Sequence, residues 1–352
     1  MLMNRIGRKK TVLLSFALHV AAMIVPLIAY DFTAVLIAFA LIGIGNTLLQ
    51  VSLNPLVTNV IAGDKLTGTL TLGQFVKAVS SFLGPIIAAA VTGSFLGWKM
   101  IFPIYAAISL LALVWLGWKV RLPRAAAVAI PHGEQRLITL PRSWLLIVCF
   151  GIINSGYGIV VAWLAPAYMA QGWSAAQAGE LVAWLALAQT ASGLGLPLLA
   201  ARKMDRRPWM GLAIAMQLAG FGGLWLAPAS APILWCMLCG AGLGGSFSLI
   251  MVIALDHLPD PRRAGTLSAL MQGFGFMLAA TGPWVAARLY HYVGDFAAAW
   301  QWQLGGLLLM SLLVVRLDPR HYPRVMRLPT ASEPTLSAPR PTDSATQSNT
   351  PA

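Results

Sequence analysis

Long apolar stretches recur along the chain and constrain its fold more than any other feature. We read ten such runs in the 352 residues, separated by short polar connections. Each run reaches roughly 20 residues, the length at which a helix crosses the hydrocarbon core of a bilayer. A backbone in hydrocarbon must satisfy its own hydrogen bonds, and the strands of a membrane barrel would alternate in polarity over roughly ten residues. The sequence therefore predicts an all-α, polytopic membrane helical bundle with ten transmembrane helices. They are expected at residues 11–30, 33–62, 66–92, 99–119, 144–170, 178–201, 209–227, 233–255, 265–290 and 297–316.

The composition excludes an ordinary water-soluble protein. Hydrophobic residues make up 58% of the chain and charged residues only 10%, whereas soluble domains have about 25% charged residues. The net charge of +13 would suggest a nucleic-acid partner in a soluble protein. Here the basic residues mark the cytoplasmic loops of a membrane protein, so the expected partner is the lipid bilayer and no nucleic acid is expected.

The distribution of Lys and Arg predicts how the helices are oriented. Of the 24 such residues, 21 fall on one side of the predicted bundle, two fall on the other and Lys77 lies within a helix. This asymmetry predicts that both termini are cytoplasmic. The predicted domains are a four-helix half (residues 1–120), a cytoplasmic linker (121–143), a six-helix half (144–316) and a cytoplasmic, largely disordered tail (317–352).

Three amides follow one face of the second predicted helix. Asn46, Gln50 and Asn54 are spaced at i, i+4 and i+8, and Pro55 weakens the local backbone hydrogen bonding. Polar side chains in a span usually face a cavity or the bundle interior. We interpret the row as the wall of a solute path, and the alternative is amide bonding that only holds helices together.

One lysine lies deep in the third predicted helix. Lys77 shares its face with Gln74 and Ser81, and no Asp or Glu lies deep in any predicted span. A bound anion could therefore supply its partner. The alternative is a structural contact with the carbonyl groups of a helix end.

The second half offers further polar or aromatic candidates within its spans. For each of them, lining of the solute path and plain packing remain open alternatives. The candidates are Asn154, Tyr157, Trp163, Gln189 and Gln272.

No motif supports catalysis, a cofactor or a metal site. Residues 240–245 match GxGxxG, but they lie within an apolar helix, where glycines serve close helix packing. Cys236 and Cys239 match CxxC in the same span and are also expected to serve packing. HExxH, GxSxG and paired carboxylates are absent from the sequence. His19 stands alone in the first predicted helix and is expected to be structural. We therefore expect no enzyme.

Several segments resemble major facilitator superfamily transporters. The start, MNRIGRKKT, is similar to the loop that joins the second and third helices of that superfamily. Residues 2–119, with GIGNTLLQVSLNPLVTNV and LTLGQFVKAVSSFLGP, resemble the fucose–galactose–glucose symporter branch. Residues 140–323, with SWLLIVCFGIINSGYGIVVAWLAPAYM and LCGAGLGGSFSLIMVIALDH, resemble the cyanate-transporter branch. The resemblance implies two loops on the cytoplasmic side that control gating. They would use Arg5, Gly7, Arg8, Lys9, Asp205, Arg206 and Arg207.

The resemblance also implies a fold and a function. The fold would be the major facilitator fold, N-terminally truncated by two helices and split into four plus six. The function would be secondary transport by alternating access in a bacterial inner membrane, by a monomer and without cofactors, with a solute site between the halves. The solute would be a cyanate-like small anion, and a sugar is the alternative. Gln50 would replace a membrane carboxylate of fucose permeases, so proton coupling is not expected there. A truncated fragment without transport activity is the alternative of another class.

Overall fold

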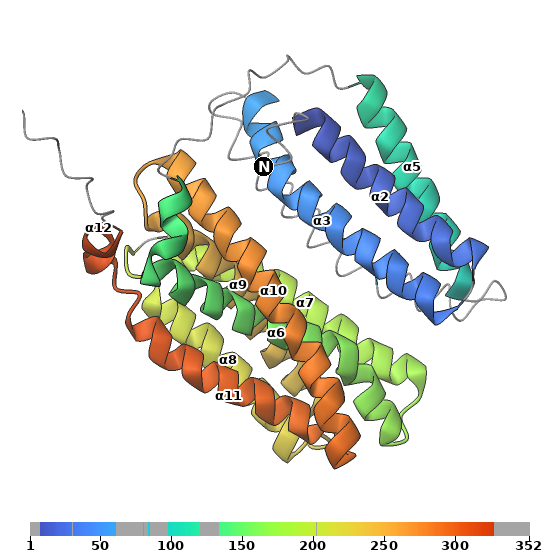
Figure 1. Cartoon of the computed structure of the whole chain (residues 1–352). Helices are drawn as coiled ribbons and strands as arrows, with labels where there is room; N and C mark the ends of the chain where they lie inside the picture. Colours follow the sequence, from blue (N-terminus) through green and yellow to red (C-terminus); the bar gives the residue numbers. More distant parts are fainter. Residues whose placement is uncertain are drawn as a thin grey trace, which may run out of the picture.

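The computed structural model describes residues 8–29, 31–60, 80, 84, 98–119, 134–201 and 203–326, and every regular element in this part is a helix (Figure 1). The long helices are α2 (Arg8–Ile28), α3 (Phe32–Val60), α5 (Ile101–Lys119), α6 (Pro141–Ala170), α7 (Ala175–Ala200), α8 (Arg207–Leu226), α9 (Pro232–Asp256), α10 (Pro261–Val293) and α11 (Ala297–Val315). The short helices are η1 (Trp98–Met100), η2 (Glu134–Thr139), η3 (Pro319–His321) and α12 (Tyr322–Val325).

The predicted membrane spans are largely confirmed. Among the described residues, 8 helices are long and apolar enough to cross a membrane: α2, α3, α5, α6, α7, α8, α9 and α11. The ninth predicted span is present as α10, which at 33 residues is long enough to cross but less apolar than the others. The third predicted span, residues 66–92, lies almost wholly outside the described residues. The all-α class and the bundle architecture are confirmed.

Several boundaries of the second half differ from the sequence prediction by a few residues, including both ends of α10 and the starts of α6 and α7. Helix α6 begins at Pro141, whereas the prediction placed its start at residue 144. A proline fits the first turn of a helix because its missing N–H would have no partner there. The chain after α11 is also folded, since η3 and α12 extend the helical structure to Val325, although the prediction ended the six-helix half at residue 316.

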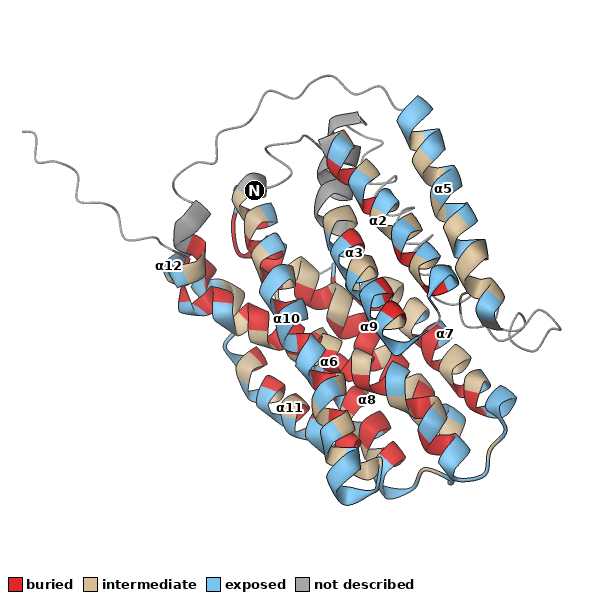
Figure 2. Cartoon of the chain, turned by 45° about the vertical axis from the view of Figure 1, so that its right-hand side comes forward, coloured by how far each residue is buried: buried red, intermediate tan, exposed pale blue. Residues whose placement is uncertain are grey.

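The long helices pack in two groups (Figure 1). In the described part of the chain, α2 contacts α3 and α5 in the first group, and α6 to α11 form the second group. Buried residues concentrate in the second group, as Figure 2 shows. Helices α6, α8 and α10 begin at one end of this group and α7, α9 and α11 end there. We call it the basic end, because Arg142, Arg206, Arg207 and Arg316 lie at it.

Glycines let α9 pack closely between α7 and α8. A Cβ atom on Gly240 or Gly244 would collide with backbone atoms of Leu185 or Gln189 on α7. A Cβ atom on Gly242 would lie 2.6 Å from the carbonyl oxygen of Ala213 on α8. Such close approach of backbones is typical of small residues at helix interfaces in membranes. The interpretation of residues 240–245 as a packing motif is therefore confirmed. Cys236 and Cys239 are also fully buried in α9, as packing residues would be.

The first group is joined by small and polar residues. Ser15 Oγ on α2 donates a 2.8 Å hydrogen bond to the carbonyl oxygen of Gly45 on α3. The His19 ring lies against the same glycine, and its Nδ1 is 2.8 Å from the carbonyl oxygen of Ser15. His19 therefore occupies a helix–helix contact, as expected. Lys9 Nζ donates to the carbonyl oxygen of Gly117 on α5 at 3.1 Å.

Candidate functional site: a solute path beside α6

Two polar side chains lie halfway along the open face of α6. Tyr157 is 38% exposed, and Asn154 is half-buried one turn earlier on the same face. Asn154 Nδ2 donates one of its two hydrogens to the carbonyl oxygen of Phe150 at 2.8 Å, which leaves its second N–H and its amide oxygen available. The opposite side of α6 carries buried residues such as Gly156 and Ile159. In the structure, Asn154 and Tyr157 are therefore accessible from outside the second group.

Two other candidates of the second half lie on neighbouring helices. Gln189 is half-buried near the middle of α7, with its backbone packed against Gly244. Gln272 is half-buried on α10, where its Nε2 donates to Ser268 on the same helix, at 3.3 Å to the carbonyl oxygen and 3.2 Å to Oγ. The amide nitrogen of Gln272 is thus already bonded locally, whereas its oxygen remains an acceptor.

Trp163 lies in an aromatic cluster. Its ring stacks at 6.2 Å from the ring of Tyr290 on α10 and lies 5.8 Å from that of Phe296, just before α11. Its indole N–H is buried without a hydrogen-bond partner among the described atoms. These contacts favour the packing alternative for Trp163, because its ring neighbours come from α10 and from the residue that precedes α11.

The amide row of the first half is described only in part. Asn46 on α3 is exposed, and its neighbour Gly45 is buried against α2. The backbone of α3 continues as a helix through positions 50 and 54 to Val60. The side chains of Gln50 and Asn54 lie outside the described residues, as do Gln74 and Lys77.

Of the two predicted gating loops, the second has all three of its candidate residues, Asp205, Arg206 and Arg207, within the described part of the chain. The guanidinium of Arg207 donates to the Asp205 carboxylate with a shortest distance of 2.8 Å, which holds the pKa of Asp205 below its ordinary value. Arg206 Nε pairs with Asp256 at the end of α9 at 3.3 Å, and the same side chain donates to the carbonyl oxygens of Ala200 and Lys203. The loop therefore joins the ends of α7, α8 and α9. Arg5, Gly7 and the side chain of Arg8 in the first loop lie outside the described residues.

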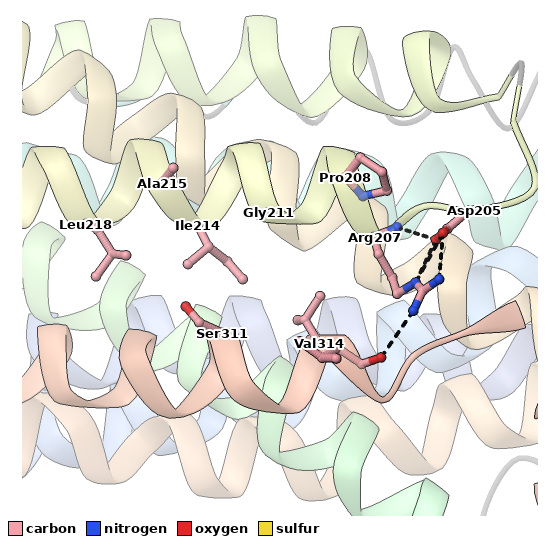
Figure 3. Close-up of a pocket in the computed structure, with 10 residues that line it drawn as sticks. Asp205, Arg207, Pro208, Gly211, Ile214, Ala215, Leu218, Ser311 and Val314 are labelled. Carbon is pink, nitrogen blue, oxygen red and sulfur yellow. Dashed lines mark hydrogen bonds and ion pairs between the residues drawn. The ribbon is translucent and has the colours of Figure 1, made fainter.

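A cleft of about 450 Å³ opens between α8 and α11 next to this loop (Figure 3). Arg207 lies at its mouth, and small or apolar side chains line the remainder. The two helices lie on the flank of the second group that is remote from α2, α3 and α5 (Figures 1 and 2). This cleft is therefore not the predicted solute path between the halves. Its lining includes Gly211, Ile214, Ala215, Leu218, Ser311 and Val314.

Comparison with known protein families gives a match to the Major Facilitator Superfamily over residues 1–283. The chain belongs to this superfamily. Among curated relatives, it is 40% identical over 190 residues to the cyanate transport protein CynX of Escherichia coli (strain K12), covering 54% of this chain and 49% of that protein. It is 32% identical over 174 residues to the 2-nitroimidazole transporter of the same organism, covering 49% and 43%. The chain spans about half the length of these relatives.

Solved structures of the superfamily share the fold. The D-xylose–proton symporter matches with a TM-score of 0.67 at 16% identity, covering 90% of this chain and 81% of that one. The fucose–proton symporter of Escherichia coli matches with a TM-score of 0.62 at 12% identity, covering 90% and 85%. The predicted major facilitator fold is confirmed. The expectation that the chain is no enzyme agrees with membership of a transporter family.

Proposed function

We propose that the chain transports a small polar solute by alternating access, and that the solute is a cyanate-like small anion. The observation that carries this proposal is the pair Asn154 and Tyr157 on the open face of α6, at half its length. A hydroxyl and an amide can both donate hydrogen bonds to an anion. Major facilitator proteins place their solute site near the midplane, between the halves. The 40% identity to CynX supports the choice of solute.

Lys77 supplies the positive charge in this proposal. No Asp or Glu occupies the middle of a predicted span, where it could neutralise this lysine. An ammonium group at this depth is costly unless it has a partner, and a transported anion would be one. Asn46, Gln50 and Asn54 complete the path from α3 with hydrogen-bonding amides.

The proposed orientation places the basic end in the cytoplasm, with both termini on that side of a bacterial inner membrane. It rests on the 21 basic residues expected on one side of the bundle and on the positive-inside rule. We propose that the chain acts as a monomer.

The test is solute uptake by vesicles that contain the purified full chain. We expect uptake of labelled cyanate and none of labelled hexose. Tyr157→Phe and Lys77→Ala should each lower the uptake rate roughly tenfold, as expected for the loss of one hydrogen bond or charge contact in a buried site. Tyr292→Phe, at a residue that is 79% exposed on α10, is the matched control. Uptake of hexose alone would favour the sugar alternative, and uptake of neither solute would favour an inactive fragment.

A further inference from the structure

The chain after α11 turns back and docks on the basic end of the second group. Residues 317–326, which we call the tail segment, contain η3 and α12. Leu317, Tyr322 and Met326 are only 1%, 6% and 4% exposed, although they follow the last membrane span. A short segment with three buried apolar anchors is held in place by packing.

An aromatic stack anchors the tail segment to α9 and α6. The Tyr322 ring lies 3.7 Å from the ring of His257, the residue after α9, with an angle of 21° between the planes. The guanidinium of Arg142, in the first turn of α6, lies 6.0 Å from the centre of the Tyr322 ring. Tyr322 Oη donates to the carbonyl oxygen of Leu317 at 3.1 Å. One side chain therefore contacts the ends of two helices that are far apart in the sequence.

Polar contacts anchor the segment to α8 and fix its junction with α11. Arg207 Nη2, at the start of α8, pairs with Asp318 at 3.2 Å, and its Nη1 donates to the carbonyl oxygen of Val315 at 3.3 Å. Arg142 Nη1 donates to the carbonyl oxygen of Arg316 at 2.6 Å. The tail segment thus joins the ends of α6, α8, α9 and α11.

The docked segment also covers a polar atom without a partner. His257 is 2% exposed, and its Nε2 has no hydrogen-bond partner among the described atoms. A buried polar group without a partner destabilises the state that buries it. Release of the segment would return this nitrogen to water, which offsets part of the packing lost. The missing hydrogen bond therefore lowers the net stability of the docked state.

We propose that the tail segment is a clamp that makes the basic ends of α6, α8, α9 and α11 move as one unit. Docking couples these ends, so the second group moves as a rigid body against the first during the transport cycle. Release uncouples them. The docking part of the inference rests on the contacts alone, and only its consequence for transport rests on the proposed function.

Hydrogen exchange of the full chain tests the docking. In Tyr322→Ala, amides in residues 142–146, 207–211 and 253–257 should exchange roughly tenfold faster, because local opening becomes easier when contacts are lost. Tyr322→Phe retains the ring and should exchange like the unaltered protein. Tyr292→Ala removes an exposed ring from the opposite end of α10 and is the matched control. If Tyr322→Ala cannot be purified folded, Asp318→Asn gives a milder test and should accelerate exchange at residues 207–211.

The outcomes separate the clamp from general packing and from the proposed function. Equal exchange in Tyr322→Ala and Tyr322→Phe, or equal acceleration at the opposite end in residues 164–170, would overturn the docking role. In vesicles, Tyr322→Ala should lower the rate of cyanate uptake several-fold while Tyr322→Phe retains it. Local acceleration of exchange with unchanged uptake would overturn the coupling role. If the unaltered chain takes up no solute, the proposed function fails while the exchange measurement still decides the docking.

Discussion

Gly244 lets α9 approach the backbone of α7, and replacement of this glycine tests the packing of the second group. Its α-carbon faces the carbonyl group of Gln189, so the Cβ atom of an alanine would collide with that oxygen. The obstacle is backbone and not the end of a flexible side chain, so α7 and α9 would have to separate. Overpacking of this kind costs about 1–3 kcal/mol. Alanine also stabilises a helix by about 0.5–1 kcal/mol relative to glycine, which offsets part of this cost.

The expected result for Gly244→Ala is therefore a net loss of up to about 2.5 kcal/mol in the free energy of unfolding. Gly222→Ala on α8 is the matched control, because a Cβ atom there meets no atom within 4 Å. That control should be as stable as the unaltered protein or gain up to about 1 kcal/mol. Unfolding of the detergent-solubilised protein, followed by circular dichroism against denaturant, measures both variants side by side.

The test depends on which of the two variants, Gly244→Ala or Gly222→Ala, has the lower free energy of unfolding. A Gly244→Ala protein that unfolds at the same denaturant concentration as Gly222→Ala, or at a higher one, would refute the reasoning. It would mean that α7 and α9 can separate at no cost, and that the glycines of α9 do not set the helix spacing. Gly195→Ala on α7 is a second control, since no atom lies within 4 Å of its Cβ position.

Two further predictions concern a buried histidine and a contact in the first group. Burial lowers the pKa of His257 from 6.5 to about 4, so between these values the unfolded chain binds more protons than the folded one. Stability therefore rises as the pH increases through this window, by up to about 3 kcal/mol. His257→Phe should flatten the dependence of unfolding free energy on pH in this window. An unchanged dependence would contradict the assignment of this effect to His257. The charged or titratable neighbours of His257 are Arg142, Asp256 and Tyr322. Ser15→Ala, which removes the 2.8 Å bond to Gly45, should cost about 0.5–1 kcal/mol of unfolding free energy. Ser311→Ala, at a serine that bonds only within α11 among the described contacts, should cost less, and equal losses would count against the role of Ser15.

The helices could be predicted from the sequence because their signal is local. A run of about 20 apolar residues has only one stable form in hydrocarbon, whatever its neighbours. The glycines of α9 were predictable for a related reason, since small residues in an apolar helix serve close packing wherever their partner lies. The start of α6 was missed by three residues because Pro141 was not read as a first-turn residue.

Contacts between distant segments could not be predicted from one sequence. His257 and Tyr322 are 65 positions apart, and neither lies in a pattern that indicates a partner. Trp163 was a candidate for the solute path as an aromatic side chain in a span, but its ring neighbours are Tyr290 in α10 and Phe296 just before α11, far along the sequence. Asn154 and Tyr157 could be assigned to one face from their spacing. Which face of α6 is open depends on how α10 and α11 pack against it, and no single helix encodes that.

The central claim is that the open face of α6 borders a water-filled path and not lipid. The most direct test is the alkylation rate of a cysteine at position 157 by a hydrophilic maleimide, because a thiol reacts as the thiolate and this form needs water. Background alkylation of the native cysteines should be low, since Cys149, Cys236 and Cys239 are all 0% exposed. We predict that Tyr157→Cys reacts readily in membrane vesicles, whereas Leu312→Cys, at a position 72% exposed on α11, reacts slowly because lipid surrounds it. Equal and slow reaction at both positions would contradict the account.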